Sequence, residues 1–316
     1  MNIWTATGLL MSHATIDAVP ELIPAGTARG GRPRPGPWTR FMMRFGKALL
    51  RLLVVLIGVF WLLPTFGLAV ASLRSSADNS ATGWWTVFTA PAQLTLDNYA
   101  QVLQNERIVE SLWNTVLITV PSTLLVVLLG ALGAYALAWM DFPGRDWLFA
   151  LVVALIVVPI QVAIVPDARI FRALGIYGEI PAVVAFHVAF GLPFAIFLLR
   201  NFFLNIPRDL LEAARIDGAR EMLIFARVVL PIGWPAIASL AIFQFLWVWN
   251  DLLVALVFAT SDNAPITYAL REQMRSFSSN LDTIGPGAFL SMLVPLAVFF
   301  AFQRYFVQGV LAGSGK

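Results

Sequence analysis

The sequence contains no cysteine, which excludes disulfide bonds, thiolate chemistry and cysteine-ligated metals. Histidine is almost as scarce: His13 and His187 are the two in the chain, and they lie far apart in sequence, so we predict no metal site. The phosphate-binding pattern Gly-x-x-x-x-Gly-Lys-Ser/Thr is absent too, and this chain is expected to bind neither ATP nor another cofactor. Because no set of residues suggests a catalytic centre either, we do not expect an enzyme.

Charged residues are also few. They make up 12% of the chain, whereas soluble domains carry about a quarter. Hydrophobic residues make up 59%, which is typical of an integral membrane protein. The small net charge of +3 gives no support for nucleic-acid binding. The composition therefore predicts a protein that is solvated mainly by membrane lipid.

Six runs without a charged residue each hold at least 20 residues, enough to cross the hydrocarbon core once as a helix. They predict an all-α integral membrane protein with six transmembrane helices, bent where a run contains proline. The runs cover residues 52–73, 111–140, 147–166, 180–199, 228–250 and 283–303.

These runs divide the chain into five predicted parts. A basic cytoplasmic tail, flexible at its start, precedes the first transmembrane helix. An external segment then leads to the main transmembrane domain, and a short cytoplasmic C-terminus follows. In the external segment, Trp84 and Trp85 are expected to anchor the chain at the membrane interface. The five parts cover residues 1–48, 49–73, 74–110, 111–310 and 311–316.

Positive charge predicts the orientation of the spans. If the N-terminus is cytoplasmic, 15 of the lysines and arginines lie in cytoplasmic segments and six lie outside. Cytoplasmic loops carry the excess of Lys and Arg in membrane proteins. Both termini are therefore predicted to be cytoplasmic, and so is the segment between the fourth and fifth spans.

That cytoplasmic segment holds the most charge-dense stretch of the hydrophobic part of the chain. Pro207 suits the first turn of a helix, and Asp209 then lies near the positive end of the helix dipole. We predict a helix near residues 207–222. Gly218 lies within this stretch and breaks a helix readily, and a new apolar run follows it. An inert linker between two buried helices is the simpler interpretation.

The spacing of this stretch is more specific. Glu212, Ala213 and Ala214 are followed after three residues by a glycine, and nine residues further on by Val228, one residue, and the pair Leu230–Pro231. This pattern resembles the signature of permease subunits of binding-protein-dependent ABC importers, with valine where isoleucine is commoner. Three further blocks resemble the carbohydrate class, which includes maltose and α-glucoside permeases. They are residues 191–194, 245–251 and 303–309, and the resemblance covers residues 49–316.

The resemblance implies a type I importer fold and a set of partners. These are a second homologous permease, a dimer of ATP-binding cassette ATPases that binds ATP and Mg²⁺, and an extracytoplasmic solute-binding protein. It places the complex in the bacterial inner membrane, where it would import a sugar by alternating access. An oligosaccharide or an α-glucoside such as maltose or trehalose is expected, with much of the selection made by the binding protein.

The resemblance also assigns roles to the charged stretch, as a coupling helix that docks on the ATPase. Glu212 is expected to carry charge, Ala213 and Ala214 to pack closely, and Gly218 to make the turn. The expected coupling residues are Glu212, Ala213, Ala214, Asp217, Gly218, Leu230 and Pro231.

Polar and aromatic residues alternate at the end of the fifth predicted span. Aromatic faces with nearby amide and carboxylate groups suit a sugar, and an intramembrane carboxylate is costly unless it serves a function. The alternative is that the tryptophans anchor at the interface, that Asp251 caps or pairs locally, and that His187 packs between helices. The candidate pathway residues are His187, Gln244, Trp247, Asn250 and Asp251.

Two other classes of membrane protein are alternatives. An ion-coupled secondary transporter or channel would require several intramembrane ionisable residues as a relay, and only Asp251 comes close. A membrane enzyme would require an acid–base or metal set, which the sequence does not offer.

Overall fold

The computed structural model describes residues 36–276 and 281–313. It divides into two units, residues 1–61 and 62–316. In the first unit the described residues belong to α1 (Pro37–Ser72), which begins inside the segment predicted as a tail and continues into the second unit. The earlier part of that tail, residues 1–35, lies outside the described residues. At the other end, α13 runs to Gly313, beyond the predicted start of the C-terminal segment.

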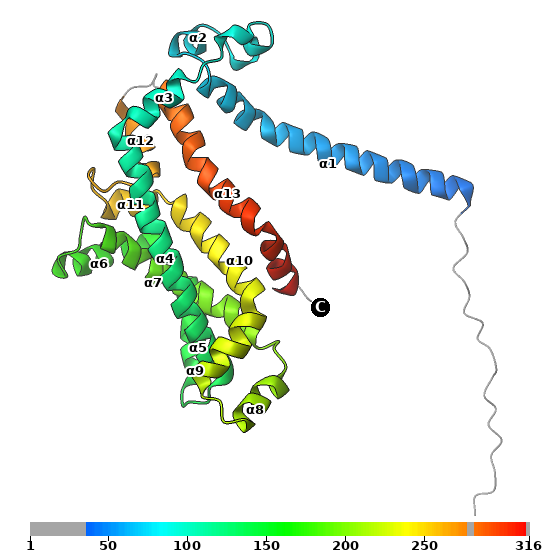
Figure 1. The fold of residues 1–316 in the computed structure, drawn as a ribbon, viewed down its shortest axis with the longest axis vertical. Helices are drawn as coiled ribbons and strands as arrows, with labels where there is room; N and C mark the ends of the chain where they lie inside the picture. The colour runs from blue at the N-terminus through cyan, green and yellow to red at the C-terminus, as the bar shows by residue number, and fades with distance from the viewer. Residues whose placement is uncertain (1–35, 277–280, 314–316) are drawn as a thin grey trace, which may run out of the picture. The chain divides into compact units, whose positions relative to one another are not determined.

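Every named element in the described residues is helical, as the sequence predicts. Long apolar helices cross the second unit, and short helices lie at their ends (Figure 1). The longer ones are α4 (Glu106–Trp139), α5 (Arg145–Ile156), α6 (Ile160–Ala173), α7 (Ile180–Phe203), α10 (Leu230–Trp249) and α13 (Leu281–Gly313). The shorter ones are α2 (Ser76–Ala81), η1 (Trp84–Phe88), η2 (Pro91–Gln93), α3 (Asp97–Gln104), α8 (Arg208–Ile216), α9 (Glu221–Ile224), the π-helical η3 (Phe225–Val229), α11 (Leu253–Phe258) and α12 (Ile266–Ser276).

Five helices in the described residues are long and apolar enough to cross a membrane. They cover the first, second, fourth, fifth and sixth predicted runs, apart from one terminal residue in each of four runs. The third run is different, because it is shared between α5 and α6, which meet at an angle of 104°. Counted as one broken span, this pair gives the sixth crossing.

The expectation of one bent helix over residues 147–166 therefore needs correction: the helix is interrupted. Pro159 has no N–H to donate to the carbonyl four residues earlier, and its ring clashes with that turn. The helix stops at Ile156, Pro159 takes an extended conformation with ψ of 133°, and α6 starts afresh at Ile160.

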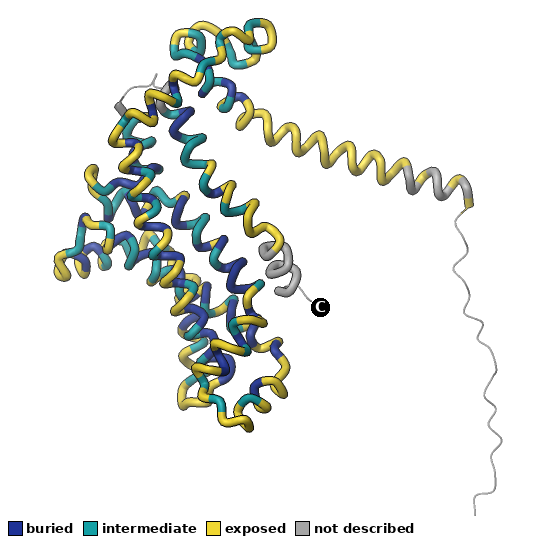
Figure 2. Tube along the Cα trace, in the orientation of Figure 1, coloured by how far each residue is buried: buried dark blue, intermediate teal, exposed yellow. Residues whose placement is uncertain are grey.

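Helices α4, α7 and α10 form the centre of the second unit, and most of the fully buried segments lie along them (Figure 2). Small residues permit the close approach. A Cβ added at Gly130 of α4 would lie 2.7 Å from the Cβ of Ala195 of α7, and one added at Gly233 of α10 would lie 2.7 Å from the Phe203 ring. Membrane helices gain little from burying apolar side chains against one another, because lipid is just as apolar. They therefore associate through close van der Waals contacts of this kind.

This packing gives a first prediction. The change Gly130→Val should destabilise the isolated subunit by about 1–3 kcal/mol, because it forces side-chain volume into a filled contact. The midpoint of thermal unfolding in detergent measures the effect. Gly58→Val is the matched control, because a Cβ at Gly58 meets nothing within 4 Å in this chain. Equal midpoints for the two variants would contradict the close α4–α7 contact.

Candidate functional site

Helix α8 lies within the stretch predicted as a helix, residues 207–222, but ends at Ile216, and it lies at the opposite end of α4 from α2 (Figure 1). It follows Pro207, carries Asp209 in its first turn and Arg215 in its last. Gly218 follows with φ of 80°, a left-handed conformation that favours glycine. A Cβ at Gly218 would meet nothing within 4 Å, so in this chain the backbone conformation, and not a lack of space, favours glycine there.

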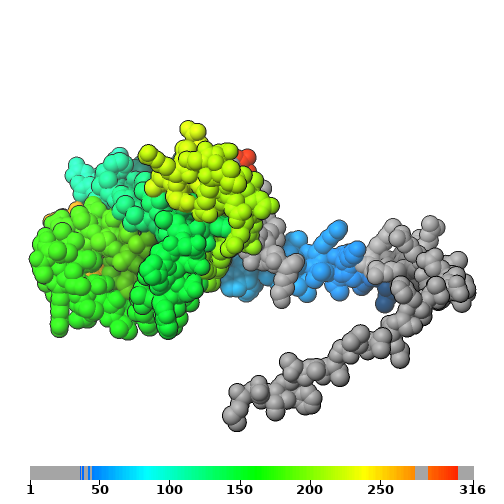
Figure 3. All heavy atoms as spheres, turned by 90° about the horizontal axis from the view of Figure 1, so that it is seen from below, coloured from blue at the N-terminus to red at the C-terminus, as the bar shows by residue number. Residues whose placement is uncertain are grey.

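The two faces of α8 differ. Leu211 is 1% exposed and belongs to a core cluster with Ile224 and Phe225, and Ala214 packs against the same cluster. Glu212 and Ala213 are exposed, and so is Ile216, at 86%. Figure 3 views the molecule from this end, with the yellow-green α8 segment at the surface. The predicted alanine pair is thus divided, with one member facing the core and the other facing outward.

A group of polar contacts joins the α8 segment to the end of α4. Arg215 Nε donates to Glu221 Oε1 at 3.0 Å, and Arg215 Nη2 donates to the Trp139 carbonyl at 3.1 Å. The Tyr135 hydroxyl donates to the other oxygen of Glu221. The hydrogen bond that Arg215 donates to the Glu221 carboxylate raises the pKa of Arg215. We call Tyr135, Trp139, Arg215 and Glu221 the α4–α8 brace.

Sequence reasoning did not find the brace. Tyr135 and Glu221 lie 86 residues apart, and Tyr135 sits in an apolar run that shows no polar pattern. The only local signal is the opposite charge of Arg215 and Glu221, which is common in a charge-dense stretch.

The last two predicted coupling residues begin α10. Pro231 is the second residue of this helix, which continues directly from the π-helical η3. Leu230 is half-buried against the core cluster that holds Leu211, whereas Pro231 is exposed. The whole segment from α8 to α10 is therefore fixed by one apolar cluster and by the brace.

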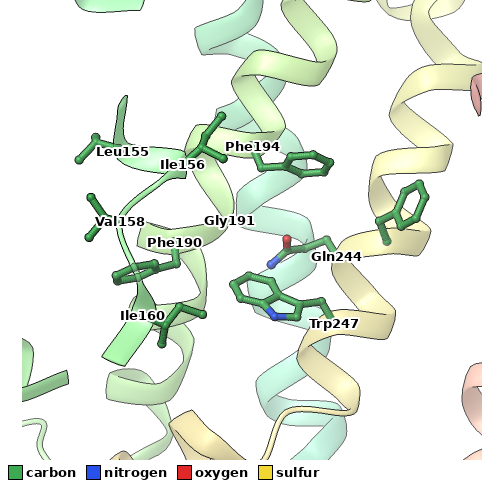
Figure 4. A pocket seen from close by; sticks show the side chains of 10 residues that line it. Leu155, Ile156, Val158, Ile160, Phe190, Gly191, Phe194, Gln244 and Trp247 are labelled. Atoms are coloured by element: carbon green, nitrogen blue, oxygen red, sulfur yellow. The ribbon is translucent and has the colours of Figure 1, made fainter. Parts of the chain in front are cut away.

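A pocket of about 330 Å³ lies at the break between α5 and α6, against α7 and α10 (Figure 4). Most of its lining is apolar. Gln244 and Trp247 supply the polar atoms of the lining side chains, and both were predicted pathway residues. Gln244 is 3% exposed, and its Nε2 has no hydrogen-bond partner among the described residues. Gly191 leaves room for this amide, because a Cβ there would lie 2.9 Å from it.

The remaining pathway candidates do not line this pocket. His187 is fully buried, with Nε2 at 3.7 Å from Asp251 Oδ2 and its ring perpendicular to that of Trp247 at 5.4 Å. Asp251 Oδ2 also accepts from the N–H groups of Val254 and Ala255 at 3.0 and 3.2 Å, so it caps α11.

Asn250 is exposed, and its Nδ2 donates to the Leu246 carbonyl at 2.7 Å. The structure thus brings Gln244 and Trp247 together in the pocket and joins Trp247 to the His187–Asp251 pair. Asn250 stays apart from both groups.

The brace yields a second prediction. Tyr135→Phe removes a hydrogen bond to a carboxylate that is half-exposed, and should cost about 1 kcal/mol. Hydrogen exchange of the α8 amides should then quicken by about fivefold. Tyr177→Phe is the matched control, because it also loses one hydroxyl bond, at 2.9 Å to the Val257 carbonyl, but in another part of the fold. Unchanged α8 exchange in Tyr135→Phe would show that the brace does not hold this segment.

Comparison with known proteins agrees with this architecture. Residues 111–312 match the family model described as binding-protein-dependent transport system inner membrane component. The chain is 47% identical to the osmoprotective compounds uptake permease protein GgtD of Synechocystis sp. over 275 residues, 85% of this chain and 92% of that protein.

It is also 47% identical to the alpha-glucoside transport system permease protein AglG of Rhizobium meliloti over 235 residues, which cover 72% of this chain and 62% of that protein. Among solved structures, the fold is similar to a chain of a bacterial ABC transporter involved in import of the acidic polysaccharide alginate. The TM-score is 0.66 at 22% identity, covering 87% of this chain and 100% of that one. The chain therefore belongs to the family of binding-protein-dependent transport system inner membrane components.

Proposed function

We propose that the chain is the permease subunit of an ATP-driven ABC importer that moves a sugar into the cytoplasm by alternating access. The observation that carries the proposal is α8, a short helix whose one face is fixed in the core and whose other face is free for a partner. Glu212, Ala213 and Ile216 form that free face. A partner that binds it acts on the ends of α4 and α10 through the brace and the Leu211 cluster.

The partner for this face is the ATPase dimer, which holds ATP and Mg²⁺. An exposed isoleucine beside a small residue and a carboxylate offers an apolar contact with one charge to match. A cavity of about 150 Å³ lies beside α8, lined by charged side chains that include Glu212, Arg208 and Arg215. A second homologous permease and an extracytoplasmic solute-binding protein complete the complex.

The proposed cargo is an oligosaccharide or an α-glucoside such as maltose or trehalose. The name of AglG, which is 47% identical, supports the α-glucoside class. In this chain the pocket at the α5–α6 break supplies an aromatic face from Trp247 and the amide of Gln244. An indole suits the C–H face of a sugar ring, and an amide both donates to and accepts from hydroxyls.

The proposed location is the bacterial inner membrane, with both termini in the cytoplasm. The excess of Lys and Arg in the segments at that side supports this orientation. It places α8 in the cytoplasm, where the ATPase is. The alternative of an ion-coupled transporter is disfavoured, because Asp251, the carboxylate that would begin a relay, caps α11.

Coupling gives the third prediction. Glu212→Lys reverses the charge of the free face, a mismatch that costs about several kcal/mol at an interface. Gly218→Trp places a bulky residue at a backbone conformation that side chains rarely adopt, at a cost of about 1–3 kcal/mol, and adds volume beside the free face. Both variants should insert normally and lose stimulation of ATP hydrolysis by sugar-loaded binding protein. ATPase activity of the purified complex in lipid measures this.

Asp146→Lys is the matched control for charge reversal, because it is exposed at the start of α5 and lies outside α8. It should keep full stimulation. Wild-type stimulation in both the Glu212 and Gly218 variants would show that α8 is an inert linker.

The pocket gives the fourth prediction. Gln244→Met keeps the side-chain volume and removes the amide, so the sugar loses one or two hydrogen bonds of about 1 kcal/mol each. Uptake should fall by about tenfold while the complex still assembles. Phe243→Leu alters the same pocket and keeps the amide, and it should affect uptake less. Unimpaired uptake by Gln244→Met would remove this pocket from the pathway.

A further inference from the structure

The segment between α1 and α3 is folded around one buried arginine. Arg74 is fully buried, and its guanidinium makes six hydrogen-bond contacts with five oxygens, some of them sharing one N–H group. All five acceptors are neutral oxygens, contributed by Asp78 and Thr82 through carbonyls, and by the side chains of Asn79, Thr82 and Gln93. These bonds tie α2 and Thr82 to η2, with η1 between them in the chain, and we call residues 75–96 the α1–α3 cap.

The cap folds back along the apolar helix that precedes it. The Trp84 ring meets Phe66 of α1 edge-on, with centroids 5.7 Å apart. It also lies against the α1 backbone, because a Cβ at Gly67 would be 2.7 Å from Trp84 Nε1. Phe66 precedes the end of α1 by six residues, about 9 Å along the axis at 1.5 Å per residue. Trp84 therefore reaches past the end of the span toward the membrane interior.

Two exposed aromatic side chains flank Trp84. Trp85 and Phe88 have ring centroids 6.1 and 6.4 Å from that of Trp84, and they are 62% and 72% exposed. Residues 79–96 contain no charged residue. An exposed aromatic patch in an uncharged segment is costly in water and marks a surface that contacts something else.

We propose that the α1–α3 cap lies in the lipid–water interface at the membrane face where α1 ends, with Trp85 and Phe88 among the lipid headgroups. The patch continues through Phe66 onto the exposed apolar side of α1, and a membrane-spanning helix presents such a side to lipid. Aromatic residues, tryptophan above all, concentrate at this depth. Arg74 takes no part in lipid contact, because its hydrogen bonds are filled inside the cap.

The bilayer suits the patch better than the solute-binding protein does. A protein that docks and leaves uses an interface about as polar as the rest of a protein surface, whereas residues 79–96 offer it no charge to match. The fold-back of Trp84 onto α1 also holds the patch level with the end of the span and not above it.

The absence of cysteine makes the test direct, because one introduced cysteine carries the only label in this chain, which is labelled before assembly with its partners. We would spin-label Phe88→Cys in the assembled transporter, in vesicles of phosphatidylethanolamine and phosphatidylglycerol. Collision rates with oxygen, which dissolves in lipid, and with a nickel chelate, which stays in water, report the depth of the label. The matched control is Ala77→Cys, exposed on α2 beside the charged Asp78.

The expected oxygen-to-nickel ratio is severalfold higher at position 88 than at position 77. In a second variant, Gly67→Val added to Phe88→Cys displaces Trp84 and should lower the ratio at position 88. Equal ratios at the two positions would overturn the proposal. The proposal would also be overturned if the label at position 88 collided freely with the nickel chelate until sugar-loaded binding protein was added. The patch would then be a contact surface for that protein.

Discussion

Close approach between α4 and α7 is the contact on which the rest of the second unit depends. Inside a membrane, helices gain little from hydrophobic burial against one another, because lipid is as apolar as their side chains. They associate where small residues let their surfaces meet, as Gly130 does against Ala195. Other elements pack on this helix pair along its length, and the α4–α7 contact fixes where they lie.

At one end, α4 and α7 hold the α8 segment. Arg200 in the last turn of α7 donates to the Leu137 carbonyl of α4 at 3.1 Å, and the brace begins two residues before Leu137, at Tyr135. A carbonyl near the end of a helix lacks a partner within that helix. Arg200 and Arg215 supply such partners from other elements, so the end of α4 is joined to the end of α8. The contacts thus attach α8 to the end of a membrane-spanning helix.

Further along the same helices, the packing leaves room for polar chemistry. Gly191 of α7 makes space for the amide of Gln244, and the interruption at Pro159 opens the opposite wall of the pocket.

The α1–α3 cap buries a charged side chain near the end of α1. Arg74 is removed from water and lipid alike, and five neutral acceptors offset the cost of its burial.

The sequence by itself determined the all-α class, the positions of the apolar helices and the family signature at Glu212–Pro231. Each of these follows from local composition or spacing. A run of about 20 apolar residues, for example, is what a helix needs to cross a membrane. The tertiary structure decided the 104° break at Pro159, the division of Ala213 and Ala214 between two faces, and the cap around Arg74. It also decided the meeting of Tyr135 with Glu221. Proline predicts a bend but not its angle. The partners of Tyr135 and Arg74 depend on which helix ends and turns pack side by side, and no local pattern in a uniformly apolar run specifies that.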